Sequence, residues 1–435
     1  MRLAHLGLVN FRTYRRLELS LAPGVVLLVG DNAQGKTALL EAVYYLATSR
    51  SPRTGADREL VHWDAVEEPL PFSRVSGDVV KASGRVHVEI VVVIPPPSRV
   101  DLSPNPSPTR GGEQTGGVGS PPSLDRGGVG GEVPGRLEKR VKIDGVARRA
   151  LDLLGQVNVV LFTPDDIELV AGGPTLRRHY LDAALCQIDS RYCHALAQYR
   201  KILTQRNSLL RRVQEGLARR DELAFWDDQL VEYGAQVTVR RHALAWRLET
   251  RGSPIHHDLT GGRDPLRVVY RPSALMSLSD KPSDRAVVEA TQLVLQETLD
   301  PAVTSAVFRA RLTQRAAAEI ARGATLVGPH RDDFQLFAGS LDLHTYGSRG
   351  QQRTAALALK LAETEAMHEA TGEWPLLLLD DVMSELDAPR RAYVADRMAR
   401  HEQTLATATD WSDFSPALQS QAQRLTVQGG TVSPA

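Results

Sequence analysis

The chain has 435 residues, of which 42% are apolar and 24% charged, and its formal net charge is zero. This composition is typical of a globular protein long enough for two to three domains, and any basic surface must be local. No apolar run approaches the ~18 residues of a membrane span, and the first residues lack the apolar core of a secretion signal. The two cysteines, Cys186 and Cys193, fit no zinc or redox spacing. We therefore expect a cytoplasmic protein without a membrane partner.

The first elements follow from short-range patterns. Leucines alternate with polar residues in 3–8 and again in 17–21, which predicts two strands joined as a hairpin or meander. The apolar run GVVLLVG, residues 24–30, predicts a strand covered on both faces. A helix is predicted for KTALLEAVYYLAT, residues 36–48, because its apolar residues have helical spacing.

A second pair of strands is predicted at 72–80 and 84–94. Composition then changes abruptly, because nearly half of the residues from Pro95 to Gly135 are proline or glycine. Such a segment cannot bury enough apolar surface to offset its ordering entropy, which predicts a disordered insert over 95–135. EKRVKIDG, residues 138–145, is the expected return strand, and the simplest interpretation of the insert is a segment without a function of its own.

Helical periodicity dominates from Thr175 to about Arg251 and predicts an arm too irregular for a long coiled coil. After a mixed stretch to about Leu341, an α/β pattern returns. Its elements are a helix at 348–370, a strand at 375–381, a helix at 388–400 and a strand at 404–410. An α/β pattern at both ends predicts one α/β head interrupted by a helical arm. The expected parts are the head at 1–174, the arm at 175–310 and the rest of the head at 311–435.

The segment between the third strand and the first helix fits the phosphate-loop pattern G-x-x-x-x-G-K-[ST]. Its glycines let backbone amides approach phosphates closely, and the helix N-terminus favours the same anion. We expect Lys36 to reach the β/γ-phosphates and the Thr37 hydroxyl to ligate Mg²⁺. The predicted nucleotide-binding residues are Gly30, Asp31, Asn32, Ala33, Gln34, Gly35, Lys36 and Thr37.

Two adjacent acids follow four leucines at the end of a predicted strand. Asp380 is placed to support the metal shell, and Asp381 to orient or deprotonate a water. Solubilising turn residues would give the same pattern, and alone the two interpretations weigh evenly. The phosphate loop upstream favours the functional interpretation.

Between these motifs, YGSRGQQRTAALALKLAE places Ser348 at a helix N-terminus, with Gly350 and Gln351 in the first turn. By itself this is an ordinary helix cap. Its position between the phosphate loop and the paired acids favours an anion site that faces the γ-phosphate held by another subunit.

These motifs and their order resemble the ATP-binding-cassette heads of chromosome-maintenance and repair proteins, and more closely the RecF family of recombination mediators. The resemblance covers nearly the whole chain except the Pro/Gly-rich insert and the extreme C-terminus. GPHRDDF together with SRGQQRT is much more specific than the phosphate loop. The stretches that carry it are NFRTY (10–14), GDNAQGKTALLEAVYYLA (30–47), LFTPDDIELVAGGPTLRRHYLD (161–182), GPHRDDF (328–334), YGSRGQQRTAALALKLAE (346–363) and LLLLDDVMSELD (376–387).

The resemblance implies roles for single residues. ATP and Mg²⁺ would be bound by the phosphate loop and Asp380, while Asp381 stands where cassette ATPases usually carry a catalytic glutamate. Thr409 stands where transporter ATPases carry a switch histidine, which the family also lacks. The remaining implied site residues are Arg12 near the nucleotide, Ser348, Gly350 and Gln351 acting in trans, and Ser384 and Asp387 in the D-loop. The sequence assigns no Q-loop glutamine.

A basic stripe runs along the predicted arm. It comprises Arg200, Lys201, Arg206, Arg211, Arg212, Arg219 and Arg220, opposed only by Glu215. A solvated helix face would look the same, but the resemblance favours contact with DNA phosphates. His330 in GPHRDDF has no second histidine at ligand spacing, so we expect a structural or signature-supporting role for it.

The expected function is an ATP-dependent DNA-binding switch of recombinational repair, replication and the SOS response. Two copies would sandwich two ATP molecules, close on duplex or gapped DNA, and reopen after slow, DNA-stimulated hydrolysis. The resemblance implies RecR and RecO as partners in loading the recombinase. Two alternatives remain: a transporter-type cassette ATPase, and a scaffold that binds ATP without hydrolysing it.

Overall fold

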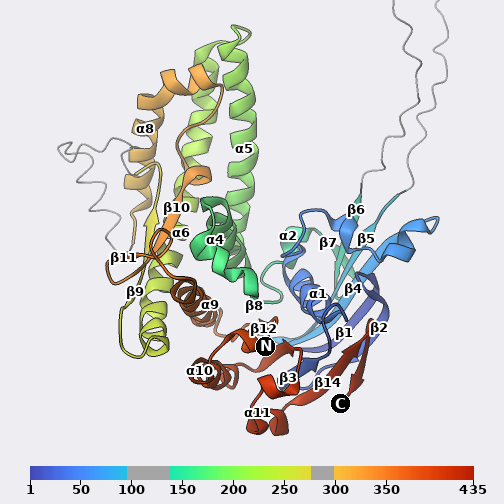
Figure 1. Cartoon of the computed structure of the whole chain (residues 1–435). Coiled ribbons are helices and arrows are strands. Elements are labelled where there is room, and N and C mark those ends of the chain that lie inside the picture. The colour runs from blue at the N-terminus through green and yellow to red at the C-terminus, as the bar shows by residue number, and fades with distance from the viewer. Residues whose placement is uncertain (96–136, 276–297) are drawn as a thin grey trace, which may run out of the picture.

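The computed structural model describes residues 1–95, 137–275 and 298–435. A head of two β-sheets carries a long helical arm that rises from one side (Figure 1). Apart from Pro95, the predicted Pro/Gly-rich insert lies outside the described residues. Within these three ranges no helix has both the length and the apolar character of a membrane span.

The first sheet is antiparallel throughout and has six strands. Their order is β2 (Tyr14–Ser20), β1 (Arg2–Phe11), β4 (Phe72–Lys81), β5 (Gly84–Val93), β6 (Glu138–Ile143) and β7 (Val146–Arg148). The predicted hairpin is confirmed by pairing of β1 with β2, and the predicted return strand by pairing of β6 with β5.

The second sheet also has six strands and is parallel except at one edge. Their order is β15 (Thr431–Pro434), β14 (Gln423–Gln428), β3 (Gly24–Val29), β13 (Gln403–Ala408), β12 (Leu376–Leu379) and β8 (Val159–Phe162). The strand that leads into the phosphate loop, β3, therefore lies between β13 and β14, which come from the end of the chain. Residues separated by almost the whole sequence build the centre of this sheet.

Helix α1 (Lys36–Thr48) contacts strands of both sheets and lies between them. Along β3, Val26 and Leu28 belong to the core shared with α1, whereas Leu27 and Val29 belong to the core on the opposite face. Helix α9 (Arg349–Thr371) contributes to that opposite core. The prediction that β3 is covered on both faces is confirmed.

In the described residues the arm has four long helices, α4 (Pro174–Ile188), α5 (Ser190–Gln214), α6 (Leu223–Leu259) and α8 (Pro301–Arg322). Helix α8 packs against both α5 and α6. The expected boundary between residues 310 and 311 falls inside α8, so the arm's helices extend to Arg322. Sequence periodicity missed this helix within the mixed stretch that precedes Leu341.

A small sheet and several short helices complete the described part. The sheet pairs β9 (Leu266–Arg271) with β10 (Asp333–Ala338), and β10 with β11 (Leu341–Asp342). The short helices are α2 (Ala150–Leu153), α3 (Glu168–Ala171), α10 (Ala388–Met398) and α11 (Pro416–Gln421).

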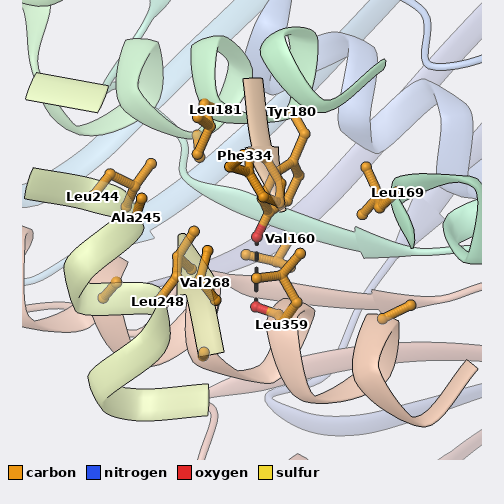
Figure 2. Close-up of a cluster of buried hydrophobic side chains, with 14 of the residues drawn as sticks. Val160, Leu169, Tyr180, Leu181, Leu244, Ala245, Leu248, Val268, Phe334 and Leu359 are labelled. Carbon is orange, nitrogen blue, oxygen red and sulfur yellow. Dashed lines mark hydrogen bonds between the residues drawn. The ribbon is translucent and has the colours of Figure 1, made fainter. Parts of the chain in front are cut away.

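The base of the arm shares one hydrophobic core with the head (Figure 2). Tyr180 of α4 and Leu248 of α6 lie in the same cluster as Val160 of β8 and Leu359 of α9. The Tyr180 hydroxyl donates a hydrogen bond to the Leu359 carbonyl oxygen at 3.4 Å. Because arm and head have no separate cores here, the arm is anchored rigidly at its base.

Candidate nucleotide-binding site

The phosphate loop joins β3 to α1, and its shape depends on two glycines. At Gly35 φ is +113°, and an added Cβ would lie 2.8 Å from Thr13 Oγ1 and 3.0 Å from the Tyr14 hydroxyl. At Gly30 an added Cβ would lie only 2.1 Å from the backbone oxygen of Val427 in β14. Both positions therefore need a residue without a side chain, as the loop pattern predicts.

Two side chains at the start of α1, Lys36 and Thr37, make hydrogen bonds that hold them in place. Lys36 is buried, and its Nζ donates to the carbonyl oxygens of Gly30 at 2.5 Å and Asp31 at 2.9 Å. The Thr37 hydroxyl donates to Asp380 Oδ1 at 3.0 Å. Residues 343 positions apart thus meet at the start of α1, where the helix N-terminus favours an anion.

Asp380 directly follows β12 and accepts a second hydroxyl bond from Thr407 at 3.0 Å. Burial raises the pKa of Asp380, and the Thr37 and Thr407 hydroxyl donors oppose that rise. A hydroxyl and a carboxylate are the oxygen ligands that Mg²⁺ prefers. Among the described residues no group of three or more His, Cys, Asp or Glu could hold a metal. The donor set fits an ion that takes its other ligands from nucleotide phosphates and water.

Asp381 adopts a left-handed backbone conformation with φ of +54°. Its N–H donates to the Thr407 hydroxyl oxygen at 2.9 Å, and its carbonyl accepts from the Ser384 hydroxyl at 2.8 Å. Its side chain remains half-buried beside Asp380. Thr409 is exposed just after β13.

Arg12 is held in place by Glu41, a residue that the sequence did not single out. Its Nε and Nη2 donate to the two carboxylate oxygens of Glu41 at 2.9 and 2.7 Å. Glu41 is only 1% exposed and also accepts the Ser51 hydroxyl at 2.5 Å. Arg12 Nη1 donates to the Glu59 carbonyl at 2.9 Å. Glu41 therefore joins the β1–β2 turn, α1 and the segment after α1. In the sequence, the one sign of this role was that Glu41 is a charged residue within the apolar run of α1.

The signature residues form an exposed helix start. Ser348 caps α9, its Oγ accepting from Gln351 N at 3.3 Å, while Gln351 Oε1 accepts from Ser348 N at 2.9 Å. Both residues and Gly350 are exposed. In the part of the chain that the structure describes, no hydrogen bond or ion pair links them to the phosphate loop.

The D-loop residues follow the paired acids. Asp387 caps α10 by accepting from Arg390 N at 3.0 Å, and Ser384 is exposed. Between them, Glu385 pairs with Arg353 of α9 at 3.1 Å. This ion pair ties the D-loop segment to the signature helix of the same chain.

The structure divides the predicted basic stripe. Arg206 was expected to face DNA, but it is 1% exposed and binds Asp227 at 2.6 Å and Glu319 at 2.7 Å. This prediction is wrong because Arg206 points into the arm's interior. Arg200 pairs with Asp182, and Arg219 with Asp221. Among the described residues, four exposed members have no ion pair: Lys201, Arg211, Arg212 and Arg220.

The GPHRDDF motif lies at the base of the arm. His330 Nδ1 lies 2.6 Å from the Tyr199 hydroxyl and its Nε2 lies 3.2 Å from the Thr325 carbonyl. Burial lowers the pKa of His330 to about 4, which keeps the ring neutral. Asp332 accepts the Tyr270 hydroxyl at 2.5 Å. These contacts support the expected structural role of His330.

Together, a phosphate loop between strand and helix, strand-end aspartates and a serine-capped helix define a P-loop nucleotide-binding head with an inserted helical arm. A family model described as an AAA domain matches residues 5–91. The chain is 43% identical to the DNA replication and repair protein RecF of Roseiflexus castenholzii, over all of both chains. It is 42% identical to that of Chloroflexus aurantiacus, over 98% of each. The chain belongs to the RecF family.

A solved structure agrees with this assignment. The recombination mediator RecF in complex with ATP is similar over 100% of this chain and 97% of that chain, with 30% identity and a TM-score of 0.78. The likeness extends through both the head and the arm, so the fold class expected from the sequence is confirmed.

Proposed function

We propose that this chain is an ATP-dependent DNA-binding protein of recombinational repair and replication-fork maintenance. ATP brings two copies together as a clamp on duplex or gapped DNA that helps to load the recombinase. Relatives named as DNA replication and repair proteins support this proposal, as does the ATP complex of the RecF mediator of the RecFOR pathway. RecR and RecO are the partners that this pathway would supply. Work on chromosomal DNA would place the protein in the cytoplasm.

The observation that carries the proposal is the incomplete nature of the site. Lys36 bonds back to the phosphate loop, and Thr37 of the same loop bonds to Asp380, so these three residues can form one side of a nucleotide site. The Ser348 end of α9 is exposed, and among the described residues no hydrogen bond or ion pair joins it to that loop. A second copy can supply this helix start to the γ-phosphate, so dimerisation and nucleotide binding would stabilise each other.

Hydrolysis would reopen the clamp. Mg²⁺ would neutralise phosphate charge, held by Thr37 and, through water, by Asp380. Asp381 is proposed to orient the attacking water. Its side chain is one methylene shorter than that of glutamate, which is consistent with slow turnover.

DNA would lie along the arm. Lys201, Arg211, Arg212 and Arg220 are exposed and offer positive charge to phosphates without any sequence code. Arg200 and Arg219 belong to the same proposed surface, although each already has a carboxylate partner.

Sedimentation velocity with and without ATP and DNA tests the clamp. Wild type should become a dimer with ATP and Mg²⁺. Lys36→Met should stay monomeric because it does not hold the nucleotide, and Ser348→Arg should bind ATP yet stay monomeric. A wild-type chain that is monomeric under every condition contradicts the clamp.

Fluorescence anisotropy tests the DNA surface. Replacing Arg211 and Arg212 by Ala should weaken binding equally for unrelated sequences. The slope of log affinity against log salt should flatten by about 1.8, since each phosphate contact contributes about 0.9. Arg219→Ala should weaken binding less than either single substitution of Arg211 or Arg212, because Asp221 already offsets the charge of Arg219. Unchanged affinity and slope in the double variant would remove the arm from the DNA site.

Phosphate release separates the remaining alternatives. A scaffold without hydrolysis would release no more phosphate than Lys36→Met or Asp381→Asn. Stimulation of wild type by duplex DNA favours the clamp, whereas stimulation by membrane fractions alone favours a transporter-type ATPase. Membership of the RecF family favours stimulation by duplex DNA.

A further inference from the structure

Thr407 is a buried polar residue of the head that belongs to none of the site motifs described above. Thr407 lies on β13, directly beside the end of β12, and is completely buried. Buried hydroxyls in a strand are costly unless they are hydrogen-bonded. The Thr407 hydroxyl forms hydrogen bonds with Asp380 and Asp381, the two aspartates of the candidate nucleotide site, and with no residue of the phosphate loop.

The Thr407 hydroxyl can serve both aspartates at once. Its oxygen accepts from the Asp381 N–H at 2.9 Å, and its proton can be donated to Asp380 Oδ1 at 3.0 Å. The Leu379 carbonyl, at 3.4 Å, is the more distant alternative acceptor. A hydroxyl has one proton, and the shorter bond to a carboxylate is the stronger use of it. Thr407 therefore bridges the metal-supporting residue and the water-orienting residue.

We propose that Thr407 is a positioning residue for ATP hydrolysis: its hydroxyl fixes Asp380 and Asp381 relative to each other. This inference rests on the proposed function. Asp381 has a left-handed backbone, which aspartate adopts more readily than most residues but which persists only when the surrounding structure holds it. Without Thr407 the Asp381 N–H would lose its acceptor, and the turn after β12 would be free to relax.

The two hydrogen bonds that Asp380 accepts come from hydroxyl groups on different structural elements. Thr37 belongs to the loop that would hold the nucleotide, whereas Thr407 belongs to a neighbouring strand of the sheet. Both hydroxyls meet Oδ1, and within the described ranges no protein donor reaches Oδ2. Thr407 thus holds Asp380 independently of the phosphate loop and leaves one carboxylate oxygen for the water shell of Mg²⁺.

The same strand provides a matched control. Thr404 is also completely buried, but its hydroxyl donates to the Met398 carbonyl at 3.3 Å, away from both aspartates. Thr404→Val and Thr407→Val remove one hydroxyl each from β13 with no change in shape. A general effect of a buried hydroxyl on the sheet should appear in both variants.

The experiment compares Thr407→Val, Thr407→Ser and Thr404→Val in three assays: ATP affinity without a divalent ion, Mn²⁺ affinity of the ATP complex by electron paramagnetic resonance, and kcat. For Thr407→Val we expect ATP affinity within about twofold of wild type. Mn²⁺ affinity and kcat should each fall about 10–100-fold, the usual effect of losing a residue that orients a metal-site group. Thr407→Ser should restore both values to within about threefold of wild type. Thr404→Val should match wild type throughout.

Three results would overturn the inference: wild-type kcat and Mn²⁺ affinity in Thr407→Val, an equal loss in Thr404→Val, or failure of Thr407→Ser to recover. If Thr407→Val does not fold, as judged by circular dichroism, Thr407→Ala takes its place with the same expected values. Wild-type phosphate release no higher than that of Lys36→Met would instead contradict the proposed hydrolysis. The Mn²⁺ titration still decides the role of Thr407 in that case.

Discussion

Replacing Arg206 by methionine should destabilise the arm without touching the DNA surface. Arg206 binds Asp227, Glu319 and Thr325 at 2.6, 2.7 and 2.8 Å, and Glu319 is itself fully buried. Removing one partner of a buried ion pair costs about 3–5 kcal/mol because the other charge stays buried. Glu319 keeps one bond, from Leu326 N at 2.7 Å. We therefore expect the lower end, about 3 kcal/mol.

Urea unfolding followed by far-ultraviolet circular dichroism measures this loss in the helices. Arg212→Met is the control, since an exposed arginine without an ion pair should change stability by no more than about 0.5 kcal/mol. Glu319→Gln added to Arg206→Met should recover much of the loss, because it removes the uncompensated charge. A loss below about 1 kcal/mol for Arg206→Met, or equal losses in both single variants, would refute this view of a buried ion pair.

Three more predictions concern the phosphate loop, Arg12 and His330. Gly30→Ala should weaken fluorescent ATP binding at least about tenfold, because its Cβ would lie 2.1 Å from a carbonyl oxygen of β14. The control is Gly173→Ala, which adds its Cβ to open space away from the loop and should bind ATP as wild type does. Glu41→Gln should lower the free energy of unfolding by about 2 kcal/mol, and a double-mutant cycle with Arg12→Gln should assign most of this to their pair. Folding lowers the pKa of His330 from 6.5 to about 4. As the pH falls below 6.5, this histidine therefore becomes protonated in the unfolded chain while it stays neutral in the folded chain, which favours unfolding. Urea unfolding should show about 2 kcal/mol less stability from this group at pH 5 than at pH 7, and His330→Gln should lack that part of the loss.

Each of these predictions has a contrary outcome. Normal ATP binding by Gly30→Ala would mean that β14 moves aside at no cost. Additive effects of the two substitutions in the Glu41–Arg12 cycle would deny their coupling. An unchanged pH response in His330→Gln would assign that response to other buried groups, of which His401 is the first to examine because burial lowers its pKa to about 4 as well.

The phosphate loop was predictable because its signals are local. The strand, the loop and the helix over 24–48 each depend on neighbouring residues, and the structure has β3 and α1 where the patterns place them. The acids at 380 and 381 follow an apolar run that can only be a strand in this context. Such elements follow from hydrophobic patterns and glycine positions alone.

Other features depend on contacts between distant segments. Glu41 meets Arg12 across 29 positions, and Thr407 meets Asp380 across 27. In the sequence each is only a polar residue within an apolar stretch. The burial of Arg206 was easier to predict, because it lies three residues after Leu203 and four before Leu210, on the apolar face of its helix. A charge at such a position indicates a buried partner, which here is Glu319.

The position of β3 in its sheet has a consequence for synthesis. Both neighbours of β3 come from the end of the chain, β13 beginning at Gln403 and β14 at Gln423. At about 5–20 residues per second, the ribosome needs roughly 20–75 s after β3 before β13 emerges. During that time an apolar strand has no partner in its own sheet, which makes it a natural client for chaperones. A nascent chain should therefore acquire ATP binding late and abruptly, when the last strands dock on either side of the first.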